Sequence, residues 1–184
     1  MSPTVTIVVR TRNRPAMLRR ALASIDSQTY RNFEVVVVND AGDEAEVRSV
    51  IEPLDAAFKK AITIVTNEVS NGREAALESG FNASRCPYYA IHDDDDSWHP
   101  DFLAKTVAYL DEHPEAGGVA TRCQIVRERV RADGTCIEID RETLSTDNHG
   151  LSLVDAMVEN YTPPISQLIR RETADRVGHW DGSL

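Results

Sequence analysis

An uninterrupted run of four carboxylates, Asp93–Asp96, has the most specific chemistry in the sequence. Two carboxylates about 4 Å apart repel by roughly 4 kcal/mol at an effective dielectric constant near 20, so such a run beside a buried strand favours a bound cation. An extended backbone would place Asp93 and Asp95 on one side. All-oxygen ligands favour Mg²⁺ or Mn²⁺ over zinc. The run therefore predicts a divalent metal site, with a solvated turn that caps the next helix as the alternative.

An EF-hand calcium loop is excluded by counting from Asp93. The sixth position, which needs glycine, is Trp98, and the twelfth, which needs glutamate, is Ala104.

Three arginines, Arg10, Arg12 and Arg14, alternate just after the first predicted strand. They can balance a phosphate group together with the backbone N–H groups of a helix that begins at Pro15. The alternative is that they only increase surface solubility. The whole chain carries a formal net charge of −10, which disfavours a general nucleic-acid binder.

Asp40 and Arg73 follow later predicted strands. A carboxylate at the end of a strand can accept a hydrogen bond from a base or ribose, although Asp40 can instead form a turn with Gly42. Arg73 can contact a nucleotide or form an ion pair with Glu74 or Glu78.

Three ring side chains lie near the acidic run. His92 and His99 flank it, and each is either a ligand or, more commonly, a structural side chain. Trp98 either stacks on a substrate or packs into the core.

Hydrophobic patterning predicts alternating strands and helices. The predicted strands are Thr4–Val9, Phe33–Val38, Ala61–Val65, Tyr88–Ile91, Gly118–Val130 and Ile165–Ile169. The predicted helices are Pro15–Ile25, Glu44–Phe58, Gly72–Ser84, Pro100–Glu112, Leu151–Asn160 and Arg171–Val177. A hairpin turn is expected at Arg131–Thr135 and a polar loop at Glu142–Gly150.

This order predicts an α/β fold with a mostly parallel sheet and helices on both faces. Ligands of such sheets bind beyond the carboxyl ends of the strands, where the arginines, Asp40, Arg73 and the acidic run all fall. The first strand is followed by neither a GxGxxG nor a Walker lysine loop, which disfavours the dinucleotide and P-loop classes.

Length and composition predict one domain, residues 1–184. Neither a spanning segment nor a secretory signal is evident, so we expect a cytoplasmic protein. Cys86, Cys123 and Cys136 form no CxxC pair and are interpreted as reduced structural thiols.

Four motifs together resemble the nucleotide-binding half of a family 2 glycosyltransferase with the GT-A, Rossmann-like fold. They are Val9–Pro15 (VRTRNRP), Val37–Gly42 (VVNDAG), Gly72–Leu77 (GREAAL) with Gly80, and Asp93–Asp101 (DDDDSWHPD). The resemblance spans essentially the whole chain. It implies transfer of a sugar, with inversion, from a nucleotide-diphosphate-sugar donor to a hydroxyl of a glycan, lipid or protein acceptor.

The resemblance also implies roles for individual residues. Asp95, with Asp93, would ligate Mn²⁺ or Mg²⁺. The nucleotide-sugar would be bound by Thr11, Arg12, Asn13, Asp40, Arg73, Asp93 and Asp94.

Some positions depart from the family pattern. Arg10 and Arg12 stand where proline and tyrosine are common, and Glu78 replaces a frequent asparagine. The catalytic base is expected beyond Leu184, in an acceptor-side portion that the chain lacks. Asp101, Asp155 or Asp181 can in principle substitute for it.

Two other functions remain open at this point. One is a non-catalytic module that binds a nucleotide-sugar and a metal. The other is a nucleotidyltransferase, which shares the α/β layout and metal-binding carboxylates.

Overall fold

The computed structural model describes residues 2–131, 135–144 and 162–178. Its strands are β1 (Val5–Thr11), β2 (Phe33–Asp40), β3 (Ile62–Asn67), β4 (Tyr88–Ile91), β5 (Gly118–Ala120), β6 (Gln124–Val130), β7 (Cys136–Thr143) and β8 (Gln167–Arg170). Its α-helices are α1 (Pro15–Asp26), α2 (Glu44–Ile51), α3 (Ala56–Lys60), α4 (Arg73–Asn82), α5 (Phe102–Glu112) and α7 (Arg171–Val177). A 3₁₀ turn, η1 (Pro164–Ser166), precedes β8.

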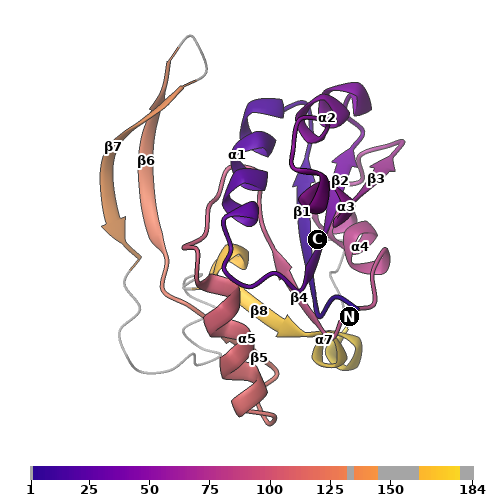
Figure 1. The fold of residues 1–184 in the computed structure, drawn as a ribbon, viewed down its shortest axis with the longest axis vertical. Coiled ribbons are helices and arrows are strands. Elements are labelled where there is room, and N and C mark those ends of the chain that lie inside the picture. The colour runs from indigo at the N-terminus through magenta and orange to yellow at the C-terminus, as the bar shows by residue number, and fades with distance from the viewer. Residues whose placement is uncertain (1, 132–134, 145–161, 179–184) are drawn as a thin grey trace.

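The main sheet has the strand order β3-β2-β1-β4-β8-β5 (Figure 1). Strands β1 to β4 are parallel, whereas β8 runs antiparallel to both β4 and β5. The chain proceeds outward from β1 to β3 and then returns to place β4 on the other side of β1. The strand order therefore reverses between β1 and β4, which is where ligands bind in open α/β sheets.

Helices cover both faces of this sheet. On one face, alternate side chains of β1 (Val5, Ile7 and Val9) pack in a core with apolar residues of α1, α2, α3 and α5. On the other face, Val8 of β1 packs with Ala76 and Leu77 of α4. The almost continuous β-branched runs of β1 and β2 thus supply apolar side chains to two cores. The predicted α/β fold is confirmed.

Several element boundaries differ from those predicted. The expected helix Glu44–Phe58 is two helices, α2 and α3, because Pro53 in the connecting turn cannot continue a helical hydrogen-bond ladder. The expected strand Gly118–Val130 divides into β5 and β6, which belong to different sheets. The middle of the expected turn at Arg131–Thr135, most of the loop expected at Glu142–Gly150, and the helix expected at Leu151–Asn160 lie outside the described residues.

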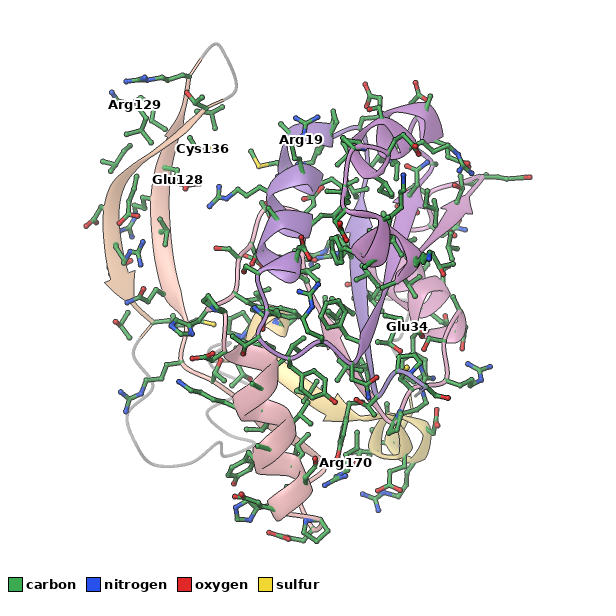
Figure 2. All side chains as sticks on the ribbon, viewed as in Figure 1. Arg19, Glu34, Glu128, Arg129, Cys136 and Arg170 are labelled. Atoms are coloured by element: carbon green, nitrogen blue, oxygen red, sulfur yellow. The ribbon has the colours of Figure 1, made fainter. Side chains whose placement is uncertain are left out.

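Strands β6 and β7 form a separate antiparallel ribbon that extends alongside α1 (Figure 1). The ribbon is joined to α1 by an ion pair of 2.5 Å between Arg20 and Glu128, which Figure 2 labels on β6. Among the described residues, no helix combines the length and the apolar composition that crossing a bilayer requires.

Candidate active site

The carboxyl ends of β1 and β4 lie side by side and bring two of the predicted motifs together. Val8 of β1 pairs with Ile91 of β4 in parallel register, so the residues that follow each strand meet beyond the sheet edge. A cavity of about 440 Å³ opens there. It is lined by Arg10, Thr11, Arg12, Arg14, Asp40, Ser70, Gly72, Arg73, Ala76, Asp93, Asp94 and Asp95. All the predicted site residues except Asn13 line this cavity.

Arg10 holds Asp93 through a two-pronged contact. Its Nε and Nη2 donate to Asp93 Oδ1 and Oδ2 at 2.6 and 2.9 Å. The contact raises the pKa of Arg10, chiefly through the hydrogen bond to Asp93. Bidentate pairs of this kind have a fixed geometry as well as a charge-assisted strength. Both oxygens of Asp93 are therefore committed to Arg10.

Asp94 is the most deeply buried carboxylate of the run, with 4% of its side chain exposed. The Thr11 hydroxyl donates to Oδ2 at 2.8 Å, and Arg14 Nη1 lies 2.8 Å from Oδ1. Burial raises the pKa of Asp94, opposed by these two partners. A buried carboxylate needs such partners, so Thr11 contributes by fixing Asp94 in place.

The acidic run turns rather than extends. The Asp96 N–H donates to the Asp93 carbonyl at 3.1 Å, and residues 94–95 form the turn. Arg14 consequently bridges the neighbours Asp94 and Asp95. The expectation that Asp93 and Asp95 share one side of an extended segment is therefore wrong.

Asp96 occupies a different environment from the rest of the run. Burial raises its pKa to about 6, reinforced by the neighbouring aspartates. It lines a second, larger cavity, which it shares with Asp95. Asp95 thus lies at the boundary between the two cavities.

Asp40 is oriented by the segment that follows β3. It accepts hydrogen bonds from Asn67 Nδ2 at 3.1 Å and from Ser70 Oγ at 2.5 Å. The turn with Gly42 is made instead by Asn39, whose amide donates to the Gly42 carbonyl at 2.8 Å. Asp40 instead lines the cavity, so the alternative of a turn between Asp40 and Gly42 is not observed.

Sequence reasoning missed the contribution of Ser70. Its signal was its position among polar residues just beyond a strand, β3, which is the same criterion that singled out Asp40 beyond β2.

Asn13 joins the loops after β1 and β2. Its φ of 53° lies in the left-handed region, which asparagine tolerates better than most residues. Its Oδ1 accepts a hydrogen bond from the Asp43 N–H at 2.9 Å. In this structure Asn13 shapes the loop next to the cavity.

The beginning of α4 supplies the opposite wall of the cavity. Gly72 precedes the helix with a φ of 97°, which favours glycine. Arg73 and the exposed Arg12 form no ion pair within the described ranges, so the alternative that Arg73 pairs with Glu74 or Glu78 is not observed. A helix N-terminus flanked by two cations of this kind suits an anionic group.

Two of the three ring side chains near the acidic run, His92 and Trp98, pack in the core. His92 is fully buried, and its Nδ1 is 2.9 Å from the Asp93 carbonyl oxygen. Burial lowers the pKa of His92 to about 4, so the ring is neutral at pH 7. Trp98 stacks on Phe102 at 4.4 Å between ring centroids and donates from Nε1 to the Ile165 carbonyl. Both residues are structural, although Trp98 also forms part of the wall of the larger cavity.

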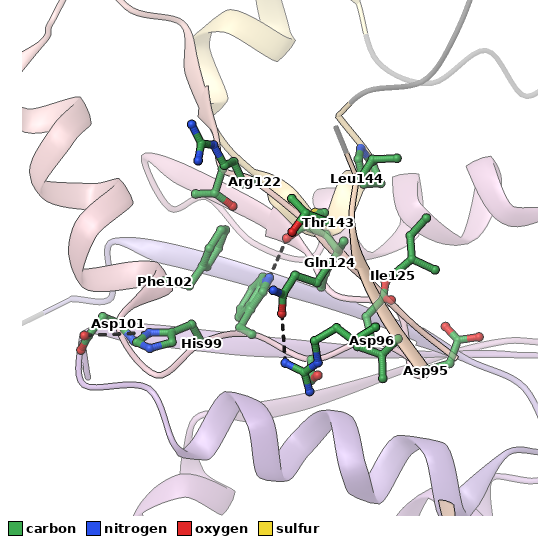
Figure 3. Close-up of a pocket in the computed structure, with 18 of the residues that line it drawn as sticks. Asp95, Asp96, His99, Asp101, Phe102, Arg122, Gln124, Ile125, Thr143 and Leu144 are labelled. Carbon is green, nitrogen blue, oxygen red and sulfur yellow. Dashed lines mark hydrogen bonds and ion pairs between the residues drawn. The ribbon is translucent and has the colours of Figure 1, made fainter. Parts of the chain in front are cut away.

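This larger cavity, of about 940 Å³, lies between the acidic run, the start of α5 and the β6–β7 ribbon (Figure 3). Figure 3 shows Asp95 and Asp96 with Gln124 and Ile125 of β6. The exposed His99 and the half-buried Asp101 are also on its wall, with 3.9 Å between His99 Nδ1 and Asp101 Oδ2. The ribbon thus adds a second compartment next to Asp95 that sequence reasoning did not predict.

A divalent cation is compatible with the residues at Asp95. The carboxylate is 52% exposed, and one of its oxygens already contacts a cation, the Arg14 guanidinium. In the part of the chain that the structure describes, no group of three His, Cys, Asp or Glu side chains is arranged to hold a metal. Mg²⁺-type ions commonly bind one or two carboxylates together with substrate phosphates. The site fits a metal that is completed by a bound diphosphate.

Solved structures with a similar fold belong to GT-A glycosyltransferases. One is a mannosyltransferase from Pyrobaculum calidifontis in complex with GDP-Man and Mn²⁺. The match covers 100% of this chain and 49% of the mannosyltransferase chain, with a TM-score of 0.69 and 22% identity. S. aureus TarS 1–349 in complex with UDP matches all of this chain and 51% of its own, with a TM-score of 0.65 and 17% identity. The fold therefore defines the class as GT-A.

The chain belongs to the glycosyl transferase family 2, whose family model matches residues 6–174. An uncharacterized glycosyltransferase of Haemophilus influenzae is 28% identical over 126 residues, covering 67% of this chain and 41% of that protein. The uncharacterized glycosyltransferase YwdF of Bacillus subtilis is 25% identical over 181 residues, covering 98% of this chain and 63% of its own. The chain thus spans less than two thirds of the length of these relatives.

Proposed function

We propose that the chain forms the donor-binding part of an inverting, metal-assisted glycosyltransferase. The reaction moves a sugar, of hexosyl type, from a nucleotide-diphosphate-sugar to an acceptor hydroxyl. The observation that carries this proposal is the 440 Å³ cavity at the β1/β4 switch point, where four arginines meet Asp40 and the acidic run. Family membership and neighbours solved with GDP-Man, UDP and UDP-GlcNAc support it.

The donor would be bound from its base to its diphosphate across this cavity. Asp40, held by Asn67 and Ser70, would accept hydrogen bonds from the nucleoside. Arg12, Arg73 and the N-terminus of α4 face the region suited to the diphosphate. Thr11 acts by holding Asp94.

Asp95 would hold Mn²⁺ or Mg²⁺ together with the diphosphate. When bound, the ion supplies positive charge that stabilises the leaving nucleoside diphosphate. The larger cavity, which Asp95 also lines, would receive the acceptor next to the sugar. Asp101 lies on the wall of that cavity, but it accepts from Thr29 and lies near Lys105. Asp155 and Asp181 lie outside the described residues.

The test is release of nucleoside diphosphate from UDP-, GDP- and dTDP-sugars over a broad panel of acceptors, with Mn²⁺ and with EDTA. Metal-dependent release together with a glycosylated product of inverted configuration supports the proposal. Donor binding without transfer to any acceptor would instead indicate a binding module. Release of pyrophosphate from a nucleoside triphosphate would indicate a nucleotidyltransferase.

A further inference from the structure

One guanidinium group joins two carboxylates of the acidic run. Arg14 Nη1 is 2.8 Å from Asp94 Oδ1, and Nη2 is 2.9 Å from Asp95 Oδ2. Because Thr11 donates to the other oxygen of Asp94, that carboxylate has a second partner independent of Arg14. The two aspartates therefore form a position for one cation, which Arg14 fills.

Arg14 is less firmly held than its neighbour Arg10. Arg10 contacts a single carboxylate through two nitrogen atoms, Nε and Nη2, and only 17% of its side chain is exposed. Arg14, the residue just before α1, divides its contacts between two carboxylates. Its side chain is 46% exposed. Arg14 and Asp95 are both about half exposed, and ion pairs of this kind contribute little stability. The buried Asp94 keeps its hydrogen bond from Thr11 when Arg14 moves, so moving Arg14 costs less than moving Arg10.

The charges that line the 440 Å³ cavity show what a movement of Arg14 would achieve. Its lining holds four arginines and four aspartates, whose formal charges cancel. A divalent cation alone would leave the lining positive, and a dianionic diphosphate alone would leave it negative. Binding of both restores the balance, provided that Arg14 gives up the oxygens that the cation takes.

We propose that Arg14 is an internal substitute for the metal. It releases the Asp94 and Asp95 oxygens when a divalent cation binds, and its guanidinium then contacts the diphosphate of the donor. The inference rests on the proposed function and adds to it a donor-binding residue, Arg14, whose displacement makes metal binding and donor binding interdependent.

The first test measures Mn²⁺ binding without nucleotide, by calorimetry or by the electron paramagnetic resonance signal of free Mn²⁺. Arg14→Gln removes the competing cation, so we expect Mn²⁺ to bind about tenfold tighter than to the wild-type chain. Arg14→Lys should give an intermediate affinity, because a single ammonium group cannot bridge two carboxylates as the planar fork does.

Arg12→Gln is the matched control. It removes the same charge from the same loop and the same cavity, but Arg12 forms no ion pair within the described residues. We expect at most a twofold change in its affinity for Mn²⁺. The proposal would be overturned if the Mn²⁺ affinity changed equally in Arg14→Gln and Arg12→Gln, or changed in neither. It would also be overturned if Mn²⁺ bound to neither the wild type nor Arg14→Gln.

The second test measures UDP and GDP binding at saturating Mn²⁺. Arg14→Gln should weaken binding of the nucleotide that the wild type prefers by about tenfold, because the displaced guanidinium is missing. An unchanged affinity would overturn the contact of Arg14 with the diphosphate. If the wild-type chain binds neither nucleotide, the proposed function fails, whereas the Mn²⁺ comparison still decides whether Arg14 competes with the metal.

Discussion

At the scale of single residues, the acidic run is a set of carboxylates with different environments. Asp93 is fixed by Arg10, Asp94 is buried against Thr11, and the half-buried Asp96 has a raised pKa. Asp95 alone among these four is exposed, and it borders both cavities. These differences make Asp95 the carboxylate best placed to meet a metal and a ligand together.

Asp95→Asn should abolish metal-dependent nucleotide binding and leave the fold intact. The substitution removes a charged ligand and also relieves repulsion within the run. Titration calorimetry with a nucleoside diphosphate and Mn²⁺ measures the loss, and circular dichroism checks the fold. Asp26→Asn, in an exposed ion pair with Arg31 at the far end of α1, is the control. An affinity equal to that of the wild type would remove Asp95 from the metal site.

Tyr89 makes the stability of the chain sensitive to alkaline pH. Burial raises its pKa from an ordinary value of 10.0 to about 12. The folded state therefore keeps the phenol neutral where the unfolded state ionises, so stability is complete below pH 10 and is lost between pH 10 and 12. We expect a loss of about 1 kcal/mol at about pH 11.

Urea unfolding at about pH 9 and pH 11 measures this loss. Tyr89→Phe should remove most of it, whereas Tyr109→Phe, at an exposed tyrosine, should leave it unchanged. An identical pH dependence in wild type and Tyr89→Phe would show that another group controls alkaline unfolding.

At the scale of elements, the close packing of α4 on the sheet positions the wall of the donor cavity. A Cβ atom built on Gly80 would lie 2.4 Å from Val8 Cγ1 and 3.0 Å from Val38 Cγ2. The absence of a side chain at this position lets the helix approach β1 and β2. Gly72 and Arg73, at the start of the same helix, reach the cavity as a result.

Gly80→Ala should destabilise the chain by about 1–3 kcal/mol, because the added methyl group must displace the helix or the two valines. The same displacement should weaken nucleotide binding through Arg73. Chemical denaturation and calorimetry measure the two effects. Ser79→Ala, on the same helix, removes only a hydrogen bond to the Ala75 carbonyl and should be close to neutral in both. A Gly80→Ala chain as stable as wild type would contradict this account of α4.

Most elements of the first half could be predicted because their signals are local. The β-branched runs of β1 and β2 and the apolar spacing of α1 each determine an element by themselves. The division between β5 and β6 could not be predicted, because the residues of both read as one strand and only pairing with β8 or β7 separates them.

At the scale of the whole molecule, the strand order accounts for which predicted residues meet. The carboxyl ends of parallel strands share one edge, so residues far apart in sequence, such as Arg10, Asp40 and Asp93, were expected together and line one cavity. The partner of each residue depends on side-chain geometry that the sequence does not encode locally. Asn39 rather than Asp40 forms the turn with Gly42, and Arg14 rather than a second aspartate accompanies Asp95.

The larger cavity also arises only at this scale. Its walls come from the acidic run, α5 and the β6–β7 ribbon. Neither the ribbon nor the acidic run forms it alone, and no motif marks it in the sequence. It adds a compartment of about 940 Å³ that shares Asp95 with the 440 Å³ cavity.

The most direct test of the central claim is calorimetric binding of UDP, GDP and dTDP, each with Mn²⁺ and with EDTA. We expect tight binding of one nucleotide in the presence of Mn²⁺ and a large loss of affinity in EDTA, because Asp95 and the diphosphate would complete the metal site together. Absence of binding of all three nucleotides under both conditions would contradict the assignment of this cavity as a nucleotide-sugar site.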